Sequence, residues 1–148
     1  MKKIKRIIAA GLCLSMVFAA TACSKSDKST SGGSSDKDKT YNVGICQLVE
    51  HEALDAATKG FKDALTEKLG DKVKFTEQNA AGDTPTCATI IDGFVSSNVD
   101  LILANATSPL QAAASATTTI PVLGTSITDY ATALDMSDWS GKTGRNIS

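Results

Sequence analysis

One segment determines which fold this sequence can adopt: Val99-Asp-Leu-Ile-Leu-Ala104, which is followed by a polar loop and then by Ser108-Pro109. The segment is apolar at nearly every position, which is typical of a strand in a parallel sheet that helices cover on both faces. Ser108 and Pro109 supply an N-cap and a first-turn proline, and they predict an Ala-rich helix that runs to about Thr117. A buried strand that leads directly into a helix indicates an α/β fold.

Strand and helix patterns alternate on both sides of this unit. The further expected strands are 41–47, 72–77 and 120–124, and the further expected helices are 51–70, 84–98 and 129–135. Such alternation favours parallel strands with right-handed crossovers. We therefore expect a three-layer α/β domain with a flavodoxin-like parallel sheet in the order 2-1-3-4 and helices on both faces. Residues 139–148 have the composition of a loop.

The first forty residues have a different character. Residues 1–22 begin with basic side chains, continue as an apolar run and end in small residues, as secretory signal peptides do. The end of this leader, directly before Cys23, resembles the lipobox of bacterial lipoproteins, in which the cysteine thiol receives a diacylglycerol. The alternative is an ordinary secreted protein that has a cysteine at this position. Residues 23–40 form a flexible Ser/Gly/Lys/Asp tether, so we expect a lobe of residues 41–148 that Cys23 anchors at the extracytoplasmic face of the cell membrane.

Charge and composition exclude several classes of protein. The 148 residues include 15 Lys and Arg against 16 Asp and Glu, and the chain becomes acidic once the basic leader is set aside. Because an acidic domain lacks the basic surface of a nucleic-acid binder, no nucleic-acid partner is expected. His51 is the only histidine and has no close cluster of other metal ligands, and no G-x-G-x-x-G motif occurs. The sequence therefore predicts neither a metal nor a cofactor.

The order of the expected strands locates a candidate site. Ligands of such sheets bind beyond the carboxyl ends of the strands, where the winding reverses, which here is between the first and third strands. The loop 105–108 enters a helix N-terminus, which favours an anion such as a carboxylate, and Asp129 after the fourth strand can hold an amine. The alternatives are that Ser108 only caps its helix, that 125–129 is a solvated loop, and that His51 caps the first helix.

Two cysteines fall in the expected domain, Cys46 within the first strand and Cys87 near the start of the second helix. Both fit as small buried hydrophobic residues. A disulfide between them in an oxidising compartment is the alternative, which the spacing along the chain leaves open.

Several segments together resemble the ABC-transporter substrate-binding protein family that includes tryptophan- and tyrosine-binding lipoproteins with the type I periplasmic-binding-protein fold. The most specific is Val43-Gly-Ile-Cys-Gln-Leu-Val-Glu-His-Glu-Ala-Leu-Asp-Ala-Ala-Thr-Lys-Gly-Phe61. The supporting segments are 78–83, 99–104, 106–111, 120–122 and 144–148. The sequence departs from the family at Glu52, where proline is common, and at Cys87, where alanine or a polar residue is usual.

The resemblance implies two α/β lobes that clamp a small molecule, and an ABC permease as the membrane partner. The resemblance also implies ligand contacts on the same loops that the order of the strands indicates. The predicted ligand-binding residues are Gln47, Glu50, His51, Ala106, Thr107, Ser108, Gln111, Thr125, Ser126, Thr128 and Asp129.

The expected function is that of the N-terminal lobe of a lipid-anchored importer component, which binds a small molecule such as an amino acid and is not an enzyme. Because the sequence ends where the family's second lobe begins, we expect a truncated chain that binds ligand weakly or not at all. Two alternatives remain: a ligand-sensing lobe for a membrane signalling partner, and a secreted α/β enzyme that uses His51 and Asp129.

Overall fold

The computed structural model describes residues 39–148, and these belong to one compact unit. The predicted signal peptide, the lipidation site at Cys23 and nearly all of the predicted tether lie outside the described residues. The strands are β1 (Tyr41–Gln47), β2 (Val73–Asn79), β3 (Leu101–Asn105) and β4 (Val122–Thr125). The helices are α1 (Glu52–Leu69), the 3₁₀ turn η2 (Gly70–Lys72), α2 (Thr84–Ser96), α3 (Thr107–Ala116) and α4 (Tyr130–Ala133).

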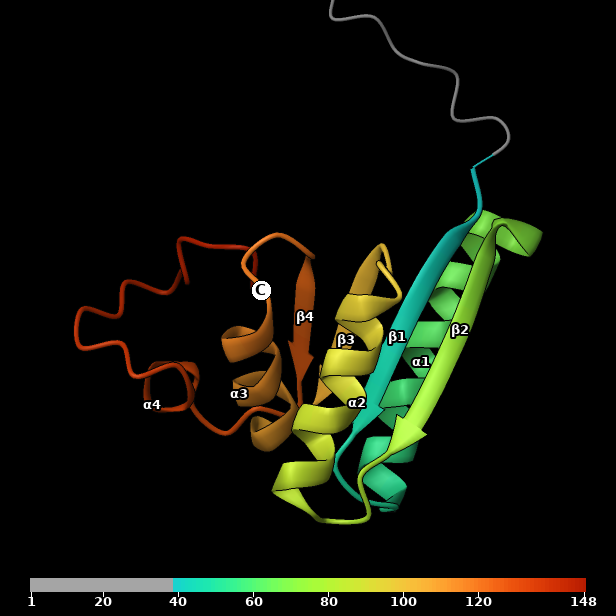
Figure 1. Ribbon diagram of the computed structural model, residues 1–148. Helices are drawn as coiled ribbons and strands as arrows, with labels where there is room; N and C mark the ends of the chain where they lie inside the picture. The colour runs from blue at the N-terminus through green and yellow to red at the C-terminus, as the bar shows by residue number, and fades with distance from the viewer. Residues whose placement is uncertain (1–38) are drawn as a thin grey trace, which may run out of the picture. The chain divides into compact units, whose positions relative to one another are not determined.

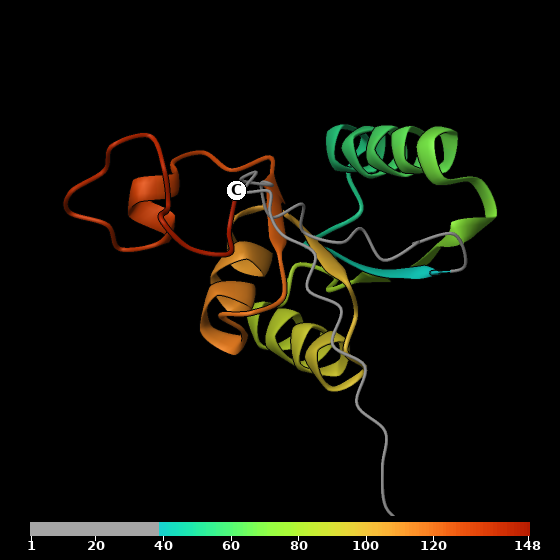
Figure 2. The same cartoon turned by 90° about the horizontal axis from the view of Figure 1, so that it is seen from above.

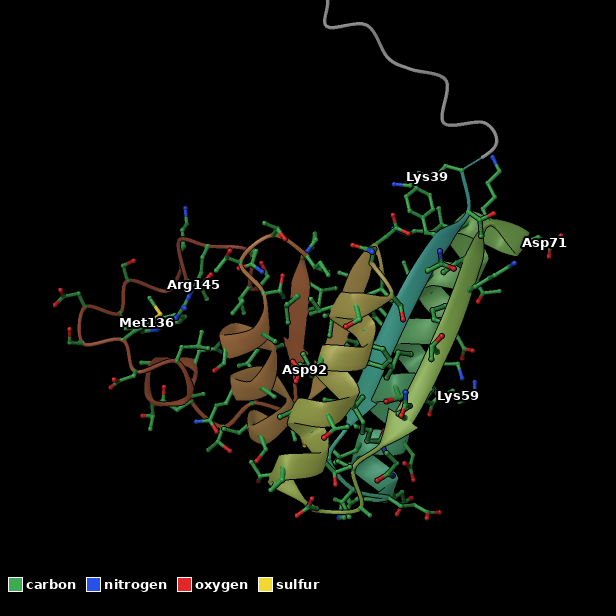
Figure 3. All side chains as sticks on the ribbon, viewed as in Figure 1. Lys39, Lys59, Asp71, Asp92, Met136 and Arg145 are labelled. Atoms are coloured by element: carbon green, nitrogen blue, oxygen red, sulfur yellow. The ribbon has the colours of Figure 1, made fainter. Side chains whose placement is uncertain are left out.

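The four strands form one parallel sheet in the order β2-β1-β3-β4, which confirms the predicted topology. All four strands point the same way, so their carboxyl ends share one edge of the sheet (Figure 1). Lys39 marks the opposite edge, where it pairs with Asp100 at 2.9 Å (Figure 3). Asp100 also accepts a hydrogen bond from the backbone N–H of Asn42 at 2.8 Å, which ties the start of β1 to the turn before β3.

Helices cover the two faces of the sheet unequally. Figure 2 shows α1 alone on one side, and α2 and α3 together on the other. The larger part of the core lies under α2 and α3, where Ile91, Phe94, Ile102 and Leu110 are buried. Since apolar side chains of alternating strand residues leave the sheet on opposite faces, a second, smaller cluster forms under α1. This cluster includes Val43, Ile45, Val73 and Leu103, with Phe61 and Leu65 of α1 packed against it.

A glycine sets the distance between α2 and the sheet. A Cβ atom added at Gly44 in β1 would lie 2.6 Å from the ring of Phe94, which is closer than two carbon atoms can approach. The absence of a side chain at Gly44 therefore lets Phe94 rest directly on the backbone of β1.

Residues 139–148 form no helix or strand, as expected, but the last three residues pair with β4. Residues 146–148 run parallel to β4 and pair with it through three backbone hydrogen bonds, including one from the N–H of Gly124 to the carbonyl of Ser148 at 2.7 Å. Ile147 is buried in the main core cluster, which supplies the packing that stabilises this edge segment. A three-residue segment with one apolar residue carries no periodic signal, so its bridge to β4 becomes visible only in the structure.

One helix start differs from the expectation. The start of α2 at Thr84 agrees with it, and Asp83 caps this helix, since its carboxylate accepts a hydrogen bond from the N–H of Thr86 at 2.9 Å. The third helix begins at Thr107 with Ala106 in the cap position, so Ser108 lies inside its first turn and does not cap it. Among residues 39–148 no helix is both long and apolar enough to cross a membrane.

Candidate ligand-binding edge of the sheet

The loops that follow the four strands are joined to one another along the carboxyl edge. Gln47, Asn105 and Thr125, the last residues of β1, β3 and β4, lie side by side in the sheet. Beyond them, the N–H of Leu48 donates to the carbonyl of Asn105 at 3.2 Å, and that of Ala106 donates to the carbonyl of Thr125 at 3.0 Å. We call the loop residues 48–51, 80–83, 106–108 and 126–129 the carboxyl edge.

The loop after β2 also belongs to this edge, although no residue of it is among those predicted to bind ligand. The N–H of Gly82 donates to the carbonyl of Leu48 at 2.7 Å, and the N–H of Ala80 donates to the carbonyl of Gln47 at 2.9 Å. The signal was available: the loop follows a strand adjacent to the first in the predicted order, and parallel strands end at the same edge.

The N-terminus of α3 is the distinctive feature of the edge. His51, Asp83 and Asp129 cap α1, α2 and α4 with their own side chains, whereas Ala106 offers α3 no side-chain cap. The first backbone N–H groups of a helix have no partner within the helix. Together with the helix dipole, uncapped N–H groups at this position favour an anion.

The backbone at three positions of the edge is strained. Ala106 has φ 112° and ψ 170°, a region that is essentially restricted to glycine, whereas Ala81 and Ser126 have φ 52° and 59°. Each of the three residues lies between a strand and the helix that follows it, after β2, β3 or β4. Such conformations cost free energy and persist only where the surrounding structure holds them, here including the bond from Ala106 N–H to the carbonyl of Thr125.

A buried polar network supports the edge from the side of α1. Oε1 of Gln47 accepts hydrogen bonds from the hydroxyl of Thr58 at 2.7 Å and from Nδ2 of Asn105 at 3.3 Å. Nδ2 of Asn105 also donates to the carbonyl of Leu54 at 2.8 Å and to the Thr58 hydroxyl at 3.0 Å. Nε2 of Gln47 donates to Asp55 at 2.6 Å. The side chain of Gln47 is thus engaged within the protein, where it holds α1 against the strand ends.

Asn105 was not singled out from the sequence, although it is fully buried between β1 and β4. Among the described residues, its Oδ1 atom has no hydrogen-bond partner. Asn105 is a polar residue at the end of an otherwise apolar strand. That position is the signal that could have identified it.

His51 and Asp129 each serve the start of a helix. Nδ1 of His51 accepts a hydrogen bond from the N–H of Ala53 at 3.2 Å, which is the capping role that the sequence left open. Asp129 accepts from the hydroxyl of Thr132 at 2.8 Å and from the N–H of Ala131 at 2.9 Å. The Thr132 hydroxyl, followed by the backbone N–H groups, lowers the pKa of Asp129 below its ordinary value, so this carboxylate stays ionised.

A hollow of about 330 Å³ lies between the start of α3 and the loop before α4. Four of the predicted residues, Thr107, Gln111, Thr128 and Asp129, line it together with Thr132 and Ala133. The structure thus brings together predicted side chains from the start of α3 and from the loop after β4. Hydroxyl, amide and carboxylate groups around one open helix end can bind a small polar molecule.

The other predicted residues do not line this hollow. Ser108 accepts a hydrogen bond from the Thr84 hydroxyl at 3.3 Å and lines a groove between α2 and α3. Ala106 is buried, Thr125 is half-buried, and Glu50 and Ser126 are exposed.

A larger hollow of about 560 Å³ lies beside the C-terminal segment and not at the strand ends. It is lined by Tyr130, Trp139 and residues around Arg145, and the Tyr130 and Trp139 rings stack with their centroids 6.1 Å apart. None of the predicted ligand-binding residues lines it. We place the candidate site at the smaller hollow because the open helix N-terminus is there. In residues 39–148, His, Cys, Asp and Glu side chains form no group that could hold a metal ion.

Residues 42–148 match the family described as ABC transporter substrate binding protein, and the chain belongs to this family. This membership confirms the resemblance drawn from the sequence. It also confirms the expectation of a binding protein and not an enzyme, so the alternative that used His51 and Asp129 as catalytic groups is set aside. Proteins of this family are extracytoplasmic.

Known relatives resemble the chain over part of their length. A tyrosine-binding protein of Clostridioides difficile (strain R20291) is 45% identical over 135 residues, which are 86% of this chain and 38% of the relative. Two solved structures each cover 74% of this chain and 38% of their own, with a TM-score of 0.68. One is a ligand-free, open substrate-binding protein with adhesive properties from Clostridium difficile, at 40% identity. The other is an ABC domain in complex with L-Trp from Streptococcus pneumoniae, at 34% identity.

Proposed function

We propose that this chain supplies one lobe of the solute-binding component of an ABC importer and that the lobe receives an amino acid at the carboxyl edge. The observation that carries the proposal is the uncapped N-terminus of α3 beside the hollow that Thr107, Gln111, Thr128 and Asp129 line. The names of two relatives, one tyrosine-binding and one in complex with L-Trp, support an amino acid with an aromatic side chain.

The two charges of an amino acid match two features of the edge. Its carboxylate suits the N–H groups and the dipole at the start of α3. Its ammonium group suits an acidic surrounding, and the carboxyl edge contains Glu50, Asp83 and Asp129 but no Lys or Arg. Of these acids Asp129 lines the hollow and stays ionised, so we assign the ammonium contact to Asp129, with Glu50 as an exposed second carboxylate.

The remaining predicted residues receive roles that follow from their contacts. Thr107, Gln111 and Thr128 are proposed to contact the ligand directly. Gln47 and His51 are proposed to act through the loop after β1, because their side chains are bonded to α1. Ala106, Ser108, Thr125 and Ser126 are proposed to shape the edge through their backbone.

The lobe alone forms one wall of a site, and the chain spans 38% of the length of the relatives it matches. We propose that a second lobe supplies the opposite wall. Closure of two lobes around a ligand gives a state that differs in shape from the open one, and an ABC permease recognises that closed state.

The membrane attachment is a proposal about residues outside the structure. We propose that residues 1–22 are removed and that Cys23 carries a lipid anchor. Metabolic labelling with a radioactive fatty acid in a bacterial host tests this directly. The wild-type chain should incorporate label and sediment with membranes, whereas Cys23→Ala should do neither. A Cys23→Ala chain that stays labelled and anchored would show that the anchor is elsewhere.

The binding proposal is tested by affinity measurements on the chain with L-tyrosine and L-tryptophan at millimolar concentration. Thr107→Val removes a hydroxyl at the hollow, and we expect it to weaken binding several-fold. Asp129→Asn should weaken it more, because a charge-assisted contact is stronger than a neutral one. Thr76→Val on exposed β2 is the matched control and should leave affinity unchanged. Equal affinities in Thr107→Val, Asp129→Asn and Thr76→Val would exclude the hollow as the site.

A further inference from the structure

Cys46 and Cys87 belong to one buried cluster between the sheet and α2. Cys46 is the residue before Gln47 at the carboxyl end of β1, and Cys87 lies in the first turns of α2. Both side chains are fully buried free thiols, and each lies near enough to the other to shift the other's pKa. A disulfide needs adjacent Cβ atoms on facing elements, and two cysteines of one cluster, on a strand and on the helix packed against it, can supply such a pair.

We propose that Cys46 and Cys87 are a modification site, at which an extracytoplasmic disulfide joins β1 to the start of α2. The family to which the chain belongs is extracytoplasmic, and disulfides persist outside the reducing cytoplasm. The bond would close a loop of roughly forty residues that contains all of α1 and β2, and closing a loop of that length restricts the unfolded chain.

The burial of the pair determines when it is oxidised. Burial raises the pKa of the Cys46 thiol to about 12, and burial also raises the pKa of Cys87. Because the thiolate is the form that attacks a disulfide, neither thiol reacts readily once α2 has packed against β1. The pair is therefore oxidised during folding, while solvent still reaches the two cysteines.

The oxidant is a disulfide, either of an oxidoreductase protein or of a small thiol. The thiolate of one cysteine attacks one sulfur of the oxidant, which forms a mixed disulfide and releases one thiol of the oxidant. The thiolate of the second cysteine then attacks the sulfur of the first, so the Cys46–Cys87 bond forms and the second thiol of the oxidant leaves. Two electrons pass to the oxidant, and the two protons lost from the cysteines end on its two thiols.

The disulfide would stabilise the part of the lobe that carries the candidate site. Cys46 is adjacent to Gln47, whose side chain holds α1, and Cys87 is in the helix that Asp83 of the carboxyl edge caps. A covalent link between these two elements fixes the loops after β1 and β2 relative to each other. The proposal does not depend on which ligand binds there.

The test uses the full 148-residue chain, reduced and unfolded in guanidinium chloride and then refolded in a mixture of reduced and oxidised glutathione. Free thiols are blocked with an alkylating reagent, and the chain is cut with trypsin. Cleavage after Lys and Arg places Cys46 in peptide 40–59 and Cys87 in peptide 75–142, and it leaves Cys13 and Cys23 together in peptide 7–25. Mass spectrometry then identifies the partner of each cysteine.

We expect peptides 40–59 and 75–142 to be recovered as one disulfide-linked species. Recovery of both peptides with alkylated cysteines, joined to glutathione, or linked to peptide 7–25 would overturn the proposal. When the folded chain is first reduced in denaturant and refolded without oxidant, the subsequent reaction with oxidised glutathione should be at least about 100-fold slower than during refolding. An equally fast reaction would show that the pair is not protected as the structure implies.

Thermal unfolding gives a second readout. The oxidised chain should melt about 10 °C or more above the reduced chain, given the usual size of disulfide stabilisation in a domain of this length. The Cys87→Ala variant should lose this dependence on the redox state of the buffer. If the oxidised and reduced wild-type chains melt at the same temperature, the pair does not act as a link between β1 and α2. The peptide map needs no variant, so a Cys87→Ala chain that fails to fold leaves that test intact.

Discussion

The hydroxyl of Thr58 donates a hydrogen bond across 2.7 Å to Oε1 of Gln47, and this buried contact fastens α1 to the end of β1. Thr58 is the one buried residue of α1. The apolar side chains of the helix are half-buried or exposed. Phe61 and Leu65 supply apolar contacts between this helix and the sheet. The polar network around Gln47 and Asn105 adds buried hydrogen bonds that hold α1 at the candidate site.

Replacing Thr58 with valine keeps the shape of the side chain and removes this donor. We expect Thr58→Val to lower the free energy of unfolding by about 1–2 kcal/mol, because Oε1 of Gln47 loses its shortest bond within a buried network. Urea unfolding measures the change. Thr66→Val, on the exposed face of the same helix, is the control and should change the unfolding free energy by less than about 0.5 kcal/mol. Equal effects of the two substitutions would show that the network does not stabilise the fold.

The strained backbone at Ala106 predicts a stabilising substitution. Glycine adopts φ 112° without steric cost, so Ala106→Gly should raise the free energy of unfolding by about 1 kcal/mol after its extra freedom in the unfolded chain is subtracted. The same change at Ala114, inside α3, should instead lower it by about 1 kcal/mol, because glycine is a poor helix former. Destabilisation by both substitutions would indicate that Ala106 is not strained in solution.

The contact of Phe94 with Gly44 predicts the opposite result for a methyl group in β1. Gly44→Ala places a carbon within 2.6 Å of the Phe94 ring, so α2 must move away from the sheet, at a cost of about 1–3 kcal/mol. Gly60→Ala meets no atom within 4 Å and lies inside α1, where alanine is favoured by about 0.5–1 kcal/mol. The midpoint of chemical unfolding should therefore fall in Gly44→Ala and rise in Gly60→Ala. A Gly44→Ala variant as stable as the wild type would contradict the close packing of this face.

Asp100 predicts how stability depends on pH. Its carboxylate accepts a hydrogen bond from the N–H of Asn42 and pairs with Lys39, which lowers its pKa below the ordinary value. A pKa lower in the folded state means that Asp100 stabilises the fold above its ordinary pKa and that this contribution is lost as the pH falls through the lowered value. Between about pH 5 and 3, Asp100→Asn should therefore lose less stability than the wild type. Parallel pH curves of the two proteins would refute this assignment.

The sheet could be predicted from the sequence because each of its elements has a strong local pattern. The apolar run 99–104 and the alternating helices leave few topologies open, and right-handed crossovers select the order that is found. The same order located the carboxyl edge, and four of the predicted residues do line one hollow there.

Other parts of the site depend on contacts between distant segments, which local patterns do not contain. The role of Gln47 was unclear from the sequence because its partners Thr58 and Asn105 are brought to it only by the packing of α1 and the pairing of β3. Ser108 resembles an N-cap in the sequence, but α3 starts two residues earlier, with Ala106 in the cap position and its N–H bonded to the carbonyl of Thr125. The pairing of residues 146–148 with β4 likewise needs the whole sheet as its template.

The central claim is that the open N-terminus of α3 receives the carboxylate of an amino acid. The most direct measurement is NMR of the ¹⁵N-labelled chain, titrated with L-tryptophan and, in parallel, with tryptamine, which has the same indole and ammonium groups but no carboxylate. The account predicts that L-tryptophan shifts the backbone amide signals of Thr107 and Ser108 most strongly and that tryptamine leaves them in place. Equal shifts of these amide signals with both compounds, or shifts confined to the hollow of Tyr130 and Trp139, would contradict it.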